Sequence, residues 1–279
     1  NAFDFGDLIL FCVKLFEDHK DIKAIYQNNF KYILVDEFLD TNFIQNKWLN
    51  LLVNDKHVAV GAASPIPGAA ALLAKEEAKL NNKRLRVTIL HSNKYNNFTD
   101  GARELFDCAA QGRIDTFFLG GVQIDGQANI NLVGTGTYPK IEKRFPGSFG
   151  SALMYFVVPQ IILFREEHSP RTLVDQVDFI SAPGASDENI YRPGGPKYLI
   201  TNRALFKFNK NLKKFSLLKL NQNQTIQDIK ELTGFKFDIS ENISDMLNPD
   251  TTRLKTLRDK IAPMVSEFYP EFTNRIWGI

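Results

Sequence analysis

Cysteine is scarce in this sequence, with only Cys12 and Cys108 among 279 residues. Two thiols so far apart form no disulfide framework, and neither has neighbours at the spacing of a metal site, so we expect no bound metal. The sequence also lacks an apolar run of transmembrane length and a signal peptide. These absences predict a cytoplasmic protein with no membrane association.

A strong excess of one charge is likewise missing, because the formal net charge is only +2. Residues 1–57 hold six basic and nine acidic side chains, whereas residues 58–279 hold 28 and 23. Neither balance is typical of a nucleic-acid-binding surface, so DNA is not an expected partner. Helical periodicity is already under way at the first residues, and we expect the natural N terminus to lie upstream.

The first 57 residues contain apolar positions at helical spacing, then a short strand and a second helical stretch. The first helix is predicted from Phe5 to Phe16, where apolar side chains recur every three to four residues. The strand is predicted over residues 32–35, and the second helix begins at residues 41–42, whose side chains can cap it. This order is that of a small α/β unit.

The string over residues 30–42, Phe-Lys-Tyr-Ile-Leu-Val-Asp-Glu-Phe-Leu-Asp-Thr-Asn, resembles the Walker B motif of UvrD/Rep-type superfamily 1 DNA helicases. Residues 4–8 resemble an element upstream of that motif. The resemblance implies a Mg²⁺ contact for Asp36 and water activation by Glu37. The family's glutamine is Leu39 here, however, and the chain has no G-x-x-x-x-G-K-[ST] phosphate loop. We therefore expect residues 1–57 to be a helicase fragment without ATPase activity, joined without a linker to a second domain at residues 58–279.

The second segment alternates short apolar runs with helical stretches. Helices are predicted over residues 69–80 and 101–111, the second with Asp100 as its cap and with Glu104 on a solvated face. Apolar, strand-like runs occupy residues 58–60, 86–90, 116–119, 156–158, 161–163, 177–180 and 198–200. This alternation predicts an α/β fold in which helices cover both faces of a sheet.

Four strings of the second segment occur in the order of one known family. They are FLGGVQIDGQANIN at residues 118–131, KRFPGSFGS at residues 143–151, FISAPG at residues 179–184 and LTGFKFD at residues 232–238. Together they resemble the β subunit of glutaconate-type CoA-transferases. The resemblance implies a three-layer α/β fold, a separate α subunit as partner, and acyl-CoA as substrate. It implies coenzyme A as a substrate and no permanently bound cofactor.

The two glycine-containing strings suit the chemistry of a thioester. A thioester carbonyl needs hydrogen-bond donors when it becomes tetrahedral, and glycine lets the backbone approach a ligand closely. Gly120 and Gly121 follow a strand, where open α/β sheets bind ligands. We therefore assign these candidate substrate-binding and CoA-binding residues: Gly120, Gly121, Gly147, Ser148, Gly150 and Ser151.

Asp125, Asn129 and Asn131 complete the candidate substrate-binding set. Such side chains also stabilise turns by hydrogen bonds to the backbone. The alternative interpretation is therefore a structural role without substrate contact.

The family's catalytic glutamate, followed by Ser-Gly, ends an early strand. Alignment of residues 86–93 with that strand places His91 at the glutamate and Ser92 at the serine. Histidine can act as acid or base but cannot form the glutamyl-CoA thioester. The expected reaction is CoA transfer between an acyl-CoA and a carboxylate. Acyl-CoA hydrolysis, a non-catalytic subunit and an ATP-dependent DNA helicase fragment remain as alternatives.

Overall fold

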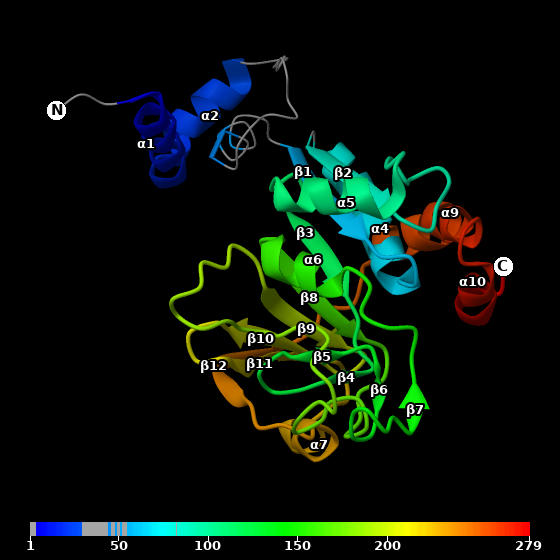
Figure 1. Ribbon diagram of the computed structural model, residues 1–279. Helices are drawn as coiled ribbons and strands as arrows, with labels where there is room; N and C mark the ends of the chain where they lie inside the picture. The colour runs from blue at the N-terminus through cyan, green and yellow to red at the C-terminus, as the bar shows by residue number, and fades with distance from the viewer. Residues whose placement is uncertain (1–3, 30–43, 46–47, 49–50, 52–54, 82) are drawn as a thin grey trace.

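The computed structural model of the chain describes residues 4–29, 44–45, 48, 51, 55–81 and 83–279 (Figure 1). Asp36 and Glu37 lie outside these residues, as does the strand predicted over residues 32–35. No helix among the described residues is long and apolar enough to cross a membrane.

Two helices, α1 (Phe5–Asp18) and α2 (Lys20–Asn29), form the described part of the N-terminal segment (Figure 1). The Asp4 carboxylate begins α1 by accepting a hydrogen bond from the backbone N–H of Asp7 at 2.8 Å, as an N-cap does. Val13 and Phe16 are buried, and the ring of Phe16 lies 5.4 Å from that of Tyr26 in α2. The helix predicted over residues 5–16 is confirmed.

One sheet of eight strands organises the rest of the described chain, in the order β12-β11-β10-β9-β8-β3-β1-β2. Its parallel half consists of β1 (Asp55–Val60), β2 (Arg84–Ile89), β3 (Thr116–Leu119), β8 (Gln160–Arg165) and β9 (Pro196–Thr201). The strands β10 (Ala204–Asn209) and β11 (Lys214–Leu220) continue it in antiparallel order, and β12 (Asp238–Asp245) runs parallel to β11. The α/β class predicted from the alternation is therefore confirmed.

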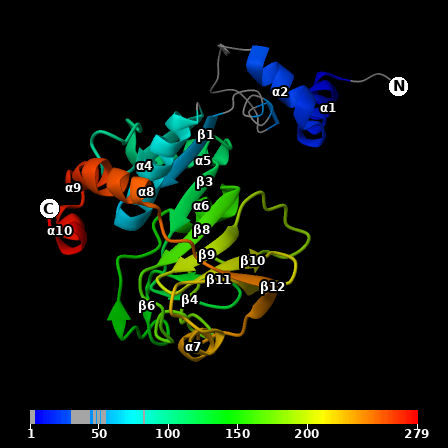
Figure 2. The same cartoon turned by 180° about the vertical axis from the view of Figure 1, so that it is seen from behind.

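Helices cover the parallel strands on both faces, which gives the three predicted layers (Figure 2). On one face α5 (Gly101–Ala110) and α6 (Ser151–Val157) pack against a core that includes Ala59, Phe117 and Leu119. On the other face α4 (Pro65–Leu80) and a C-terminal helical segment pack against Val60, Val87 and Ile89. That segment comprises α8 (Thr251–Thr256), the π-helical turn η2 (Leu257–Ile261), α9 (Ala262–Ser266) and α10 (Pro270–Trp277).

Short elements complete the fold beside the sheet. Two small hairpins pair β4 (Gln123–Ile124) with β5 (Ile130–Asn131) and β6 (Gly134–Thr135) with β7 (Lys143–Arg144). The helix α7 (Ile226–Leu232) precedes β12 and contributes the buried Ile229 to the core.

Three local predictions differ from the structure. Residues 156–157 end α6 and do not form a strand. Residues 177–180 lie in a connection, where the backbone N–H groups of Val177 and Asp178 donate to Asp125 in the β4–β5 loop and to Gln123 in β4. Asp100 occupies the N-cap position of α5, but its side chain makes no cap bond. The carboxylate of Glu104 reaches back instead, and it accepts hydrogen bonds from the backbone N–H groups of Thr99 and Asp100 at 2.6 and 3.2 Å.

The predicted domain boundary at residue 57 falls inside β1. His57 is buried there, and its ring nitrogens lie 2.9 Å from the Arg113 carbonyl oxygen and 2.9 Å from Thr88 Oγ1. The main sheet therefore begins at Asp55, two residues before the point at which the helicase resemblance was expected to end.

Removal of residues 1–54 is expected to shift the melting temperature by less than about 4 °C, because α1 and α2 pack on each other and β1 stays intact. Extending the deletion through Val60 removes a strand that lies between β2 and β3, so cooperative unfolding should be lost. Circular dichroism melting of both truncations checks this prediction. A drop of more than about 8 °C for the shorter deletion would show that the N-terminal segment stabilises the fold.

Candidate active site

A cavity of about 910 Å³ opens at the carboxyl ends of the parallel strands. The loop after β1 (residues 61–66), the loop after β3 (residues 120–122) and the end of β8 (residues 165–167) line it. Residues 147–151 and two α5 side chains, Leu105 and Phe106, complete the wall. Open α/β sheets bind ligands at this edge, and the volume is that of a small-molecule site.

The predicted Gly120–Gly121 pair lies on the wall of this cavity. A Cβ atom at Gly121 would lie 2.8 Å from the carbonyl oxygen of Gln123, closer than any side chain tolerates. A Cβ atom at Gly120 would stay 3.6 Å from the ring of Phe164. Gly121 is therefore required by the tight path of the chain, and the absence of a side chain there keeps the backbone next to the cavity.

The predicted loop over residues 147–151 also lines this cavity. Gly147 has φ of +110°, and Phe149 has φ of +46° with 82% of its surface exposed. A Cβ atom at Gly150 would overlap the ring of Phe106, which lies across the loop. Ser151 begins α6, and its Oγ is buried without a hydrogen-bond partner among the described residues. The loop thus brings its backbone to the cavity, and the Ser151 hydroxyl is buried next to it.

Asp125, Asn129 and Asn131 are buried behind the cavity and do not line it. Asp125 accepts hydrogen bonds from the backbone N–H groups of Gln127 and Asn129, each at 3.0 Å. Asn131 donates to the Gly134 carbonyl at 2.7 Å. These bonds match the architectural interpretation of the three residues, because they fix the β4–β5 hairpin that follows Gly121.

His91 follows β2 by two residues, as its alignment with a strand end predicts. Its exposed ring stacks on that of Tyr269 at 5.3 Å, and it does not line the cavity. The backbone N–H of Ser64, on the cavity wall, donates to the Tyr269 hydroxyl at 3.1 Å. Ser92 is buried and accepts a hydrogen bond from the Tyr95 backbone. His91 is thus separated from the cavity by one side chain.

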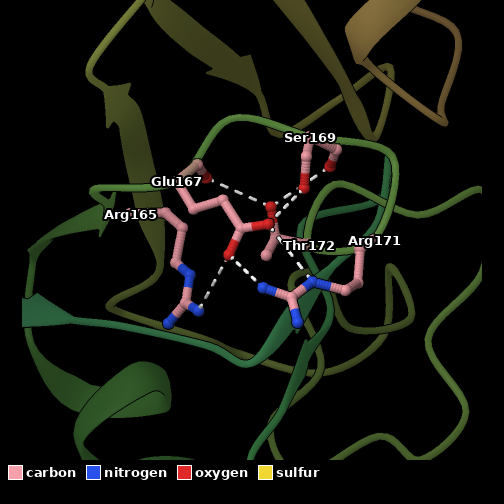
Figure 3. Close-up of polar contacts among 5 residues, drawn as sticks. All are labelled: Arg165, Glu167, Ser169, Arg171 and Thr172. Atoms are coloured by element: carbon pink, nitrogen blue, oxygen red, sulfur yellow. Dashed lines mark hydrogen bonds and ion pairs between the residues drawn. The ribbon is translucent and has the colours of Figure 1, made fainter.

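The charged side chains at the end of β8 belong to none of the motifs identified in the sequence. Arg165, Glu166 and Glu167 line the cavity, and Glu167 is the centre of a polar cluster (Figure 3). Arg171 donates to the Glu167 carboxylate at 2.7 and 3.2 Å, and Ser169 Oγ donates to it at 2.6 Å. The hydrogen bonds from Arg171 and then Ser169 lower the pKa of Glu167 and keep it ionised. The signal in the sequence was a run of charged residues directly after the apolar residues 161–164.

No cluster of three metal-ligating side chains occurs among the residues that the structure describes. The polar groups on the cavity wall include backbone groups, the side chains of Arg165, Glu166, Glu167 and Asn202, and the serines Ser64, Ser148 and Ser151.

Two family profiles match the chain. The profile of Coenzyme A transferase matches residues 44–231, and that of the UvrD/REP helicase N-terminal domain matches residues 1–63. The two matches overlap around β1, and the second covers the fragment that resembles a helicase. Over 54 residues the chain is 43% identical to a probable DNA helicase II homolog of Rickettsia conorii, which covers 19% of this chain and 8% of that protein.

The curated relatives that match the transferase part include two that are single subunits of CoA-transferases. The glutaconate CoA-transferase subunit of Acidaminococcus fermentans is 30% identical over 153 residues, which cover 52% of this chain and 56% of that protein. The 3-oxoadipate CoA-transferase subunit of Pseudomonas knackmussii is 29% identical over 153 residues, which cover 53% of this chain and 58% of that protein. The match therefore spans less than two thirds of either relative.

Solved structures share the fold. The glutaconate coenzyme A-transferase from Acidaminococcus fermentans superposes with a TM-score of 0.65 at 21% identity, over 76% of this chain and 90% of that chain. The decarboxylase AibA/AibB superposes with a TM-score of 0.61 at 24% identity, over 73% of this chain and 86% of that chain. Because the transferase profile matches more than half of its residues, this chain belongs to the Coenzyme A transferase family.

Proposed function

We propose that this chain is the β-type subunit of a heteromeric CoA-transferase and that acyl-CoA binds in the cavity at the carboxyl ends of its parallel strands. The observation that carries the proposal is that Gly120–Gly121 and the loop 147–151 line the same cavity. These residues belong to two of the four strings on which the family resemblance was based. The names of the two curated relatives, which are CoA-transferase subunits, support the assignment.

The proposed reaction moves CoA from an acyl-CoA to a carboxylate. The thioester carbonyl lies between the two glycine-containing loops, where backbone donors and the unpaired Ser151 hydroxyl stabilise the negative charge of the tetrahedral state. Leu105, Phe106 and other apolar side chains of the cavity exclude water from the acyl chain. Coenzyme A is thus a substrate in this proposal, and an α subunit completes the site.

Acyl-CoA hydrolysis is the second candidate, because His91 replaces the glutamate that forms the covalent intermediate in the family. Its ring lies outside the cavity wall and stacks on Tyr269, so its role as acid or base depends on a partner subunit closing over it. Glu166 and Glu167 are the carboxylates that line the cavity in the described chain, and they are the candidates for a nucleophile if transfer occurs.

The purified chain is expected to show no CoA transfer by itself and to gain activity when produced together with an α subunit. The physical reason is that no described residue set on this chain combines a nucleophile, a base and an oxyanion site around one reacting atom. Transfer is measured by the exchange of labelled acetate or glutarate into the matching CoA esters. Robust transfer by the lone chain would contradict the heteromeric assignment.

The two candidate reactions give different products on the protein. Intact-protein mass spectrometry after incubation of the active complex with acyl-CoA should show a CoA adduct on a glutamate if transfer is correct, because the carboxylate holds CoA as a thioester. Hydrolysis leaves no adduct and releases the free acid at the rate of CoA release. Glu166→Gln and Glu167→Gln then test which cavity carboxylate is used.

A further inference from the structure

A second cavity, of about 530 Å³, opens at the opposite edge of the sheet from the candidate active site. It lies at the amino ends of β8 and β9, next to Pro159 and Pro196, and at the end of β10, next to Asn209. Because β8 and β9 are six residues long, roughly 20 Å of strand separates the two cavities. They share no lining residue, so the second cavity is a separate place on the molecule.

Three lysines line the second cavity, which we call the basic cavity: Lys197, Lys207 and Lys210. Among the residues that the structure describes, no aspartate or glutamate lines it. An ion pair close by, Lys214 with Asp238, lies outside the lining, and within the described chain neither Lys197 nor Lys207 is in an ion pair. Cations thus surround a hollow that contains no counter-charge of its own.

The position of Lys207 in the sheet explains why its charge stays unpaired. Its neighbours across the two strand pairs are Tyr198 in β9 and Ser216 in β11, and both are uncharged. Opposite charges at such positions stabilise a sheet, so an acidic residue at either one would have been the structural partner. Lysine also protects exposed strand edges, but β10 is an inner strand of this sheet. Neither structural role accounts for Lys207.

Lys210 brings the positive charge close to a buried arginine. Its Nζ donates a hydrogen bond to the Arg192 carbonyl oxygen at 2.8 Å. Arg192 is 5% exposed, and a Cβ atom on Gly195 would lie 3.6 Å from its Nε and Nη2, so the guanidinium lies directly behind this glycine of the cavity wall. Desolvation, followed by repulsion from Arg192 and then from Lys197, lowers the pKa of Lys210. An anion in the cavity would relieve this repulsion.

Neutral hydrogen-bond donors on the same wall suit an anion with several oxygens. Ser216 and Ser240 contribute hydroxyl groups. The Asn209 Oδ1 accepts hydrogen bonds from the backbone N–H groups of Asn211 and Leu212 at 3.0 and 3.1 Å, which leaves its amide nitrogen as a donor. Ammonium groups together with such donors are typical ligands of phosphate oxygens. The volume of the cavity is that of a small-molecule site.

We infer that the basic cavity is a binding site for a small phosphate-bearing anion, with Lys197, Lys207 and Lys210 as its cationic ligands. The inference goes beyond the proposed function and does not depend on it, because the two cavities share no residue. A diphosphate group carries more charge than a single phosphate and matches three lysines better. Free pyrophosphate and the diphosphate of a nucleotide have this chemistry in common, and the test separates them.

Calorimetric titration of the full chain with pyrophosphate, at low ionic strength, measures the binding. Lys207→Gln should weaken it by about 10-fold or more, the usual effect of losing a charge-assisted hydrogen bond. Lys213→Gln is the matched control, because Lys213 is an exposed residue of the β10–β11 turn that does not line the cavity. It removes the same charge and should change the affinity by less than about threefold, since solvent and salt screen it. Equal losses in both variants would indicate general attraction to a basic surface and overturn the site.

A second pair of variants tests the cavity without removing a lysine. Ser216→Asp places a carboxylate across the strand pair from Lys207, so it should occupy the lysine and abolish pyrophosphate binding. Ser216→Asn has nearly the same shape without the charge and should bind pyrophosphate as the wild type does. Thermal melting of each variant checks that it is folded. Wild-type affinity in Ser216→Asp would overturn the inference.

Titration with ADP under the same conditions identifies the source of the phosphate groups. Tighter binding of ADP than of pyrophosphate would assign the cavity to a nucleotide, and weaker binding would assign it to free pyrophosphate. Either result supports the site, provided that Lys207→Gln weakens it. A wild-type chain that binds neither compound would overturn the inference. Acyl-CoA binding is titrated separately, so this failure would leave the proposed function unaffected.

Discussion

Replacement of Phe206 by alanine is expected to lower the free energy of unfolding by about 3–5 kcal/mol, the usual loss for a large buried aromatic side chain. Phe206 lies in β10 and is fully buried. Its ring centroid lies 6.1 Å from Phe215, 6.3 Å from Phe235 and 5.2 Å from Phe237, with edge-to-face geometry in each pair. Such pairs add to the free energy of burial, so the substitution removes both the apolar area and the aromatic contacts.

Urea unfolding followed by fluorescence or circular dichroism measures this loss, with thermal melting as a second readout. Phe149→Ala is the control, because the Phe149 side chain is 82% exposed and should contribute less than about 1 kcal/mol. If Phe206→Ala unfolded at the same urea concentration as the wild type, the antiparallel part of the sheet would not share a cooperative core with the rest. The slope of the urea dependence shows whether unfolding remains two-state.

The parallel strands were the most predictable part of the fold. The run Thr116–Leu119 lies between helices in a sheet covered on both faces, so its continuous apolar character was visible in the sequence. The run at residues 156–158 is also apolar, but it lies at the end of α6, because a short apolar run is compatible with a buried helix or a strand. Only the contacts with β3 and α5, which lie far away in the sequence, decide between them.

The glycines of the candidate site were predictable because only glycine fits where the backbone packs closely against other atoms, and glycine can be recognised in the sequence. Gly121 and Gly150 lie where a side chain would collide with Gln123 and Phe106. Arg165 and Glu167 left no comparable signal, since charged residues often follow a strand and only the structure shows which of them are paired. The contact of His91 with Tyr269 joins residues 178 positions apart in the sequence, and no local pattern indicates it.

His168 should make the protein lose stability in mildly acidic solution. The ring is buried between two threonines, with Nδ1 2.8 Å from Thr201 Oγ1 and Nε2 2.9 Å from Thr233 Oγ1. The Thr233 hydroxyl donates to the Ile229 carbonyl at 2.7 Å, so its oxygen accepts from Nε2–H and Nδ1 accepts from Thr201. This arrangement fits the neutral imidazole. Burial, followed by repulsion from Arg203, lowers the pKa of His168 from 6.5 to about 4.

Because the pKa is lower in the folded protein, the unfolded chain takes up a proton first as the pH falls. Above pH 6.5 both states are neutral at this position and the group has no effect on stability. Between pH 6.5 and about 4 the folded state becomes progressively less stable relative to the unfolded state. The total loss from this side chain is about 3 kcal/mol.

Urea unfolding at several pH values between 7.5 and 4 measures the effect on the free energy of unfolding (roughly the range over which such a histidine titrates). His168→Gln removes the titrating group, so its stability should be lower than wild type at pH 7 but should fall about 3 kcal/mol less by pH 4. His19→Gln changes an exposed histidine at the end of α1 and should keep the wild-type dependence on pH. Parallel curves for the wild type and His168→Gln would mean that folding does not lower the pKa of His168, so that the folded and unfolded states take up the proton over the same pH range.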